Sequence, residues 1–140
     1  MKGTEKQQAQ AKEIIDTAKQ AIISGNERFV PKDDMDIDYA WNHVSGKLHE
    51  IAESDNALFV IENRKHCVDP VEKVLELIGV MSEARLLITK GEITKESLRS
   101  AMRYYEEIMK MATQCEQKDS IKEKIRNCEL AMWAIDNPRL

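Results

Sequence analysis

The chain has 140 residues, of which 33% are charged and 42% are hydrophobic, and its formal net charge is −4. Such a length usually forms one domain, and the hydrophobic content is too high for a disordered chain. Strictly apolar runs are short, as at 57–61 and 130–135, whereas a membrane-spanning helix needs about twenty residues. We therefore expect no membrane segment, and one domain over residues 1–140 with flexible ends at about 1–4 and 137–140.

The charge and the cysteines narrow the class of protein further. A net negative charge disfavours general nucleic-acid binding, which depends on the neutralisation of phosphates. The three cysteines, at positions 67, 115 and 128, are odd in number and contain no C-x-x-C pair. This pattern argues against a disulfide framework or a zinc site. With no secretory leader at the start of the sequence, we expect reduced thiols and a cytoplasmic protein.

The first predicted helix covers about residues 5–24. Thr4 and Gln7 have the spacing of a capping box at its start. Apolar residues then recur at helical spacing as far as position 22, and Gly25 is expected to end the helix as a left-handed cap. A polar loop over residues 26–34 follows.

A second helical segment is predicted at about 35–62. The polar triplet at 54–56 interrupts its apolar face, so we expect a kink there or two shorter helices. Aspartates cluster at the start of this segment, where they favour helix capping and the helix dipole. The same cluster is a candidate surface for a basic protein partner. Its members are Asp33, Asp34, Asp36 and Asp38.

The third predicted helix, at about 70–90, has the clearest punctuation. Asp69 precedes Pro70, which suits the first helical position, and Gly91 follows the last turn. Apolar residues surround most of the helix, so we expect it to be the central and most buried one. One narrow stripe is polar and carries Glu72, Glu76 and Glu83. As an alternative, these carboxylates could bind a divalent metal ion, since such ions prefer oxygen ligands. Our main expectation is that the protein binds no metal and no cofactor.

The fourth predicted helix runs from Thr94 to about Cys115, and the fifth begins with a capping-box pattern at Ser120 and ends before Asn137. The short link predicts an antiparallel hairpin that turns near residue 118. Three side chains on these helices are candidates for contact with a protein partner or a second copy, because aromatic residues and methionine are enriched at interfaces. They are Tyr104 and Met111 on the fourth helix and Trp133 on the fifth.

The chain also resembles one family of enzymes. In size and helical character the chain resembles the all-α nucleotide pyrophosphohydrolases of the MazG-like kind, whose E-x-x-E and E-x-x-D motifs hold magnesium. Glu50 and Glu53 match the first motif, whereas Asp69 and Glu72 match the second only in reversed order. The resemblance implies a small magnesium-dependent nucleotide hydrolase.

The sequence thus predicts an all-α, single-domain bundle of about five helices. We expect a non-enzymatic protein-binding domain, such as an adaptor, an inhibitor or a regulatory protein. It would use the acidic segment and an apolar patch on the fifth helix, with a protein partner that could be basic or a second copy. The two alternatives are the magnesium-dependent hydrolase and an inhibitor whose acidic face mimics nucleic-acid phosphates.

Overall fold

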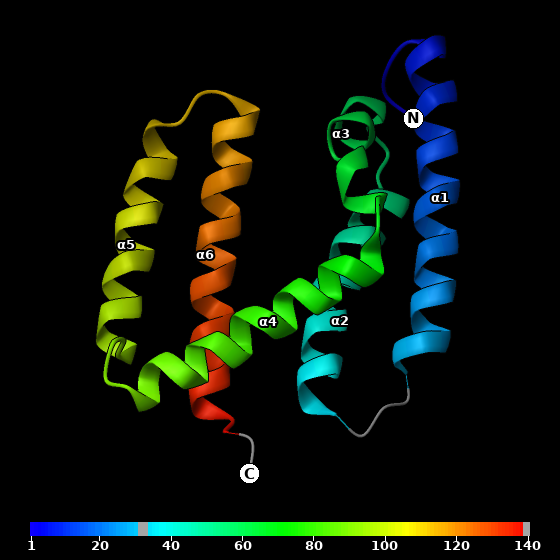
Figure 1. The fold of residues 1–140 in the computed structure, drawn as a ribbon. Coiled ribbons are helices and arrows are strands. Elements are labelled where there is room, and N and C mark those ends of the chain that lie inside the picture. The colour runs from blue at the N-terminus through cyan, green and yellow to red at the C-terminus, as the bar shows by residue number, and fades with distance from the viewer. Residues whose placement is uncertain (31–33, 139–140) are drawn as a thin grey trace. The chain divides into compact units, whose positions relative to one another are not determined.

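The fold is all-α, as the sequence predicts. The computed structural model describes residues 1–30 and 34–138. This part of the chain holds six α-helices and one short 3-10 helix, and it contains no β-strand (Figure 1). The elements are α1 (Glu5–Phe29), α2 (Met35–Ala52), α3 (Ala57–Glu62), η1 (Arg64–Cys67), α4 (Pro70–Thr89), α5 (Lys95–Met111) and α6 (Cys115–Asp136).

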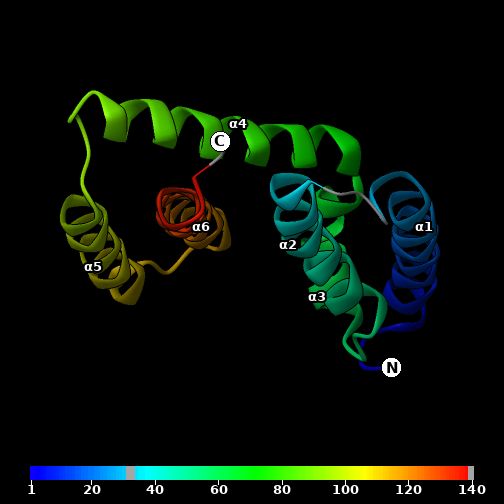
Figure 2. The same cartoon turned by 90° about the horizontal axis from the view of Figure 1, so that it is seen from below.

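The chain divides into two compact units, Met1–Glu76 and Leu77–Leu140. The division falls inside α4, which is a single helix (Figures 1 and 2). A compact unit is defined by its internal contacts and not by independent folding, so the single-domain organisation stays a prediction. The central position of the helix at about 70–90 also stays a prediction. No helix among the described residues is long and apolar enough to cross a membrane.

The first unit is built on α1, which packs against α2, α3 and η1 (Figure 1). Thr4 and Gln7 form the predicted capping box, in which the Thr4 hydroxyl accepts from the Gln7 amide and the Gln7 side chain accepts from the Thr4 amide. The buried face of α1 follows helical spacing over four turns and more. Its buried residues are Ala11, Ile15, Ala18, Ile22, Gly25 and Phe29.

The expectation that Gly25 ends this helix is wrong. α1 continues to Phe29, and Gly25 lies inside it and is buried. A Cβ atom at Gly25 would overlap the indole ring of Trp41, which is only 2% exposed. The indole Nε1 donates a hydrogen bond to Oδ1 of Asn26 at 2.9 Å, and the ring centroid lies 5.5 Å from that of Phe29. Glycine is therefore required here by the close approach of α2.

The predicted interruption of the second segment is confirmed, and it separates α2 from α3. Asp34 caps α2, because its Oδ1 accepts from the amides of Asp36 and Ile37. Asn56 caps α3 in the same way, with its Oδ1 accepting from the amides of Leu58 and Phe59. Lys2 pairs with the backbone on either side of Asn56 as an isolated bridge, so residue 2 of the predicted flexible end has defined contacts.

α4 begins at Pro70 and ends near Gly91, as predicted. Gly91 has a φ of +75°, which suits a residue without a side chain. Its amide donates to the carbonyl of Ile88, and the amide of Glu92 donates to the carbonyl of Leu87. These two bonds form a Schellman motif, which satisfies carbonyls that the end of a helix leaves without partners.

The second unit contains the hairpin of α5 and α6, whose boundaries differ from the predicted ones (Figure 1). Thr94 caps α5 as expected, but α5 ends at Met111 and α6 begins at Cys115. Ser120 therefore lies inside α6, and the predicted start there and the turn near residue 118 are wrong. The predicted end before Asn137 is confirmed.

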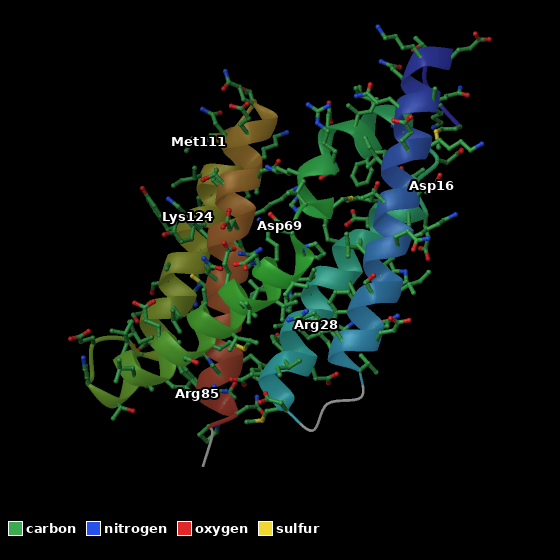
Figure 3. All side chains as sticks on the ribbon, turned by 45° about the vertical axis from the view of Figure 1, so that its right-hand side comes forward. Asp16, Arg28, Asp69, Arg85, Met111 and Lys124 are labelled. Carbon is green, nitrogen blue, oxygen red and sulfur yellow. The ribbon has the colours of Figure 1, made fainter. Side chains whose placement is uncertain are left out.

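Two basic side chains, Arg85 and Lys95, connect the C-terminal end of α6 to the rest of the second unit. Arg85 of α4 donates from Nε to the carbonyl of Ala134 at 3.2 Å and from an Nη atom to the carbonyl of Asn137 at 2.8 Å. Figure 3 shows Arg85 beside the C-terminal end of α6. Lys95, in the first turn of α5, forms an ion pair with Asp136. A cation at a helix C-terminus is also favoured by the helix dipole.

Candidate functional site

Two large apolar side chains of α5 lie on the protein surface. Tyr104 is 64% exposed and Met111 is 74% exposed. They are separated by seven residues, which places them on the same face of the helix. The sequence predicts that this pair forms part of a contact surface, and the structure leaves both side chains accessible.

A groove lies beside Met111, where the chain turns from α5 into α6. It has a volume of about 510 Å³. Ile108, Ala112 and Ile121 are half-buried and supply apolar side chains, whereas Gln114, Gln117 and Ser120 supply polar ones. We call this feature the turn groove. Figure 3 shows Met111 at this end of the hairpin.

The polar surroundings of Met111 on α5 carry both charges. Lys110 forms an ion pair with Glu107 at 3.2 Å, and both side chains are about 70% exposed. An exposed pair of this kind contributes little to stability. The turn groove is therefore a largely apolar hollow with a mixed polar rim, which suits an inserted apolar side chain better than a small charged ligand.

A smaller hollow of about 270 Å³ lies elsewhere in the second unit. It is lined by side chains of α4, α5 and α6, including Leu87, Leu98 and Cys128. The Nζ atom of Lys124 lies 5.7 Å from the centroid of the Tyr105 ring, a cation–π distance. The contact joins α6 to α5 inside the unit, and we assign the hollow a packing role.

The aspartates that the sequence analysis selected are not presented as one exposed face. Asp33 lies outside the described residues. Asp34 is half-buried and caps α2, Asp36 is fully buried, and Asp38 is exposed. Helix capping thus accounts for Asp34, and contact of the cluster with a partner stays a prediction.

The three glutamates of the polar stripe, Glu72, Glu76 and Glu83, are exposed on α4. Among the residues that the structure describes, no group of three His, Cys, Asp or Glu side chains is placed so that it could hold a metal ion. Glu50 and Glu53, from the pyrophosphohydrolase resemblance, lie at the end of α2 and just after it, and both are exposed.

Trp133, the third candidate contact residue, is half-buried on α6. Its neighbours Leu130 and Ala134 are fully buried. The segment at 130–135 is therefore largely removed from solvent, unlike Tyr104 and Met111. Of the three residues, the structure leaves only the two on α5 well exposed.

Two cysteines are free thiols that are partly or fully buried. Burial raises the pKa of Cys67 and of Cys128, and the nearby Glu129 raises the pKa of Cys128 further. The thiolate is the reactive form of cysteine. Both thiols should therefore react more slowly near neutral pH than the thiols of an unfolded chain.

Alkylation with iodoacetamide, followed by peptide mass spectrometry, tests this expectation site by site. The rate at each cysteine should reach its midpoint at a higher pH in the folded protein than in urea. Because the folded state holds these protons more tightly, stability should also fall as pH rises through the ordinary thiol range. Equal midpoints in the folded and unfolded protein would contradict the prediction.

The sequence does not predict the turn groove. Residues 112–114 contain no glycine or proline, and apolar residues continue at helical spacing on both sides of them. The usual punctuation of a helix end is therefore missing. The groove exists because the chain changes direction at these residues, and that change is a tertiary feature.

The chain is an all-α protein in which the helical hairpin of α5 and α6 exposes the apolar side chains of Tyr104 and Met111. Comparison with protein-family models, with curated proteins and with solved structures gives no match for this chain.

Proposed function

We propose that the chain is a non-enzymatic protein-binding domain, an adaptor, inhibitor or regulatory protein of the cytoplasm. The observation that carries this proposal is the exposure of Tyr104 and Met111 on one face of α5, with Met111 at the edge of the turn groove. A side chain of a protein partner would enter the groove beside Met111, and Tyr104, about two turns away along α5, would contact the same partner. Because Trp133 is half-buried whereas Tyr104 and Met111 are exposed, we place the proposed contact surface on α5 and not on α6.

The amphipathic character of α5 also supports the proposal. Its apolar residues are either half-buried or exposed, and none is fully buried, although α5 packs along α6. A helix with this much accessible apolar surface gains stability when another chain covers it. The partner can be another protein or a second copy. No observation on the described residues favours the hydrolase or the nucleic-acid mimic, and we propose neither.

The test compares two variants of the full chain as bait for proteins of the source cell. Tyr104→Ser with Met111→Ser removes the exposed apolar surface, whereas Arg99→Ser with Glu106→Ser changes two exposed polar residues of the same helix and serves as the control. A specific partner should bind the first variant at least about tenfold more weakly than the wild type, because exposed aromatic anchors contribute strongly to interfaces. The control variant should bind like the wild type.

Light scattering on the same three proteins tests whether the partner is a second copy of the chain. In that case, the wild type and the control should be dimers and the Tyr104/Met111 variant a monomer. Circular dichroism confirms that each variant is folded. Equal binding of all partners by all three proteins, with no change in mass, would overturn the proposal.

A further inference from the structure

α4 has an outer stripe of four exposed residues that differs from the surface described above. Leu75 and Leu86 are 53% and 54% exposed, and Gly79 and Ser82 between them are exposed as well. Their spacing of four, three and four residues places them along one line of the helix. Because α4 is one continuous helix, this alignment follows from helical geometry alone.

The glycine in this stripe has no structural explanation among the described residues. A Cβ atom at Gly79 would meet nothing within 4 Å, and its φ lies outside the left-handed region. A glycine inside a helix lowers helix stability relative to alanine. Gly79 has no side chain and that of Ser82 is short, so the surface of α4 is lower between the two leucines. Short side chains allow a second helix to approach closely.

The charges beside the stripe indicate what would occupy it. Glu72, Glu76 and Glu83 are exposed along one edge, and no ion pair of theirs is found within the described part of the chain. A partner with lysines or arginines along the facing edge would pair with them. The two leucines could pack against any amphipathic helix, whereas the glutamates favour one that carries lysines or arginines.

A second copy of α4 fits this edge poorly. Two α4 helices packed antiparallel through the stripe would place one row of glutamates against the other, and like charges repel. In a parallel pair the facing edge would hold Arg85, whose guanidinium is already bonded to the carbonyls of Ala134 and Asn137. The charge pattern therefore favours a different protein.

We propose that the outer stripe of α4 binds a basic amphipathic helix of a partner protein. Its apolar residues would cover Leu75 and Leu86 and pass close to Gly79, and its lysines or arginines would face Glu76 and Glu83. Such recognition of an amphipathic helix through regularly spaced apolar anchors is a general binding mode. The proposal deepens the proposed protein-binding function, but it shares no residue with the turn groove.

The probe is a synthetic helical peptide with leucines at heptad spacing and lysines along one edge, and a second peptide carries glutamates in place of the lysines. Fluorescence anisotropy measures the binding of each to the full chain. The lysine peptide should bind at concentrations up to about 0.1 mM, and at least about tenfold more tightly than the glutamate peptide. Its affinity should fall as salt is added, because exposed charges are screened.

Gly79→Gln places a side chain in the open space above residue 79 without adding charge. This substitution should raise the melting temperature, because glutamine is a better helix former than glycine. It should also lower the affinity for the lysine peptide at least about tenfold. Gly46→Gln is the matched control, since Gly46 is an exposed helical glycine of α2 with equally open surroundings. It should leave the binding unchanged. Glu76→Gln with Glu83→Gln should reduce both the affinity and its salt dependence.

The outcomes separate this inference from the turn groove. Binding that is lost in the Tyr104→Ser and Met111→Ser variant but kept in Gly79→Gln would overturn the α4 proposal and leave the proposed function standing. Failure of the lysine peptide to bind, equal binding of both peptides, or a dimer that Gly79→Gln dissociates would also overturn it. Loss in Gly79→Gln with retention in the Tyr104/Met111 variant would support it, whatever the result at the turn groove.

Discussion

Gly25→Ala should lower the free energy of unfolding by about 2 kcal/mol. The added methyl group would overlap the ring of Trp41, which is buried and also held by its hydrogen bond to Asn26. Overpacking of a rigid core costs up to about 3 kcal/mol, and the better helix propensity of alanine offsets about 1 kcal/mol of this. Urea unfolding followed by far-UV circular dichroism measures the net loss as a lower midpoint.

The same substitution at Gly46 is the control for this prediction. Gly46 lies inside α2 with nothing within 4 Å of an added Cβ. Gly46→Ala should therefore raise the stability by about 0.5–1 kcal/mol through helix propensity alone. A stabilising effect at both glycines would contradict the packing of Trp41 on α1.

A double-mutant cycle locates the cause of the loss. In a Trp41→Leu background the smaller side chain leaves room at Gly25, although the background is itself less stable. Gly25→Ala should then be close to neutral or stabilising. A loss as large as in the wild type would show that the ring of Trp41 is not the cause.

Arg85→Met should destabilise the second unit by about 2–3 kcal/mol. The guanidinium donates to the carbonyls of Ala134 and Asn137 at the end of α6, and a hydrogen bond from a charged group contributes about 1.5–3 kcal/mol. Methionine keeps a long apolar side chain but donates no hydrogen bond. Hydrogen exchange should show the largest loss of protection in the last turns of α6.

Arg99→Met is the matched control, because Arg99 is exposed on α5. It should change the stability by less than about 0.5 kcal/mol, as surface substitutions usually do. Equal effects at the two arginines would contradict a capping role for Arg85. Arg85→Lys should recover part of the loss, since lysine retains the positive charge near the helix end.

The correct helix boundaries in the sequence analysis have local causes. Thr4 with Gln7, Pro70 and Gly91 act within a turn or two of their own positions, through capping or through a backbone conformation that few residues adopt. The break at 54–56 is local as well, because Asn56 caps the helix that follows it. Such signals can be read from a short stretch of sequence.

The wrong boundaries arise where one residue type has two uses. Glycine can end a helix, as Gly91 does, or it can admit a neighbouring side chain, as Gly25 does. A serine followed by a glutamate three residues later can start a helix, or it can lie inside one, as Ser120 does. The local sequence is the same in both cases, and packing from elsewhere in the chain selects between them.

In the candidate site too, some features are predicted from the sequence and others depend on tertiary packing. Sequence periodicity places Tyr104 and Met111 off the apolar stripe of α5, and both are exposed. The turn groove and the burial of Asp36 depend on where the chain turns and on what packs beside it, which composition and spacing do not specify.

The sequence by itself therefore determined the all-α class, the capped helix starts and the faces of the helices, because these depend on neighbours within about four residues. The tertiary structure alone decided that Gly25 lies inside a helix against Trp41, that α6 begins at Cys115, and that Met111 borders a groove. These features depend on close packing between segments that are distant in the chain, and that packing leaves no periodic signal in the sequence.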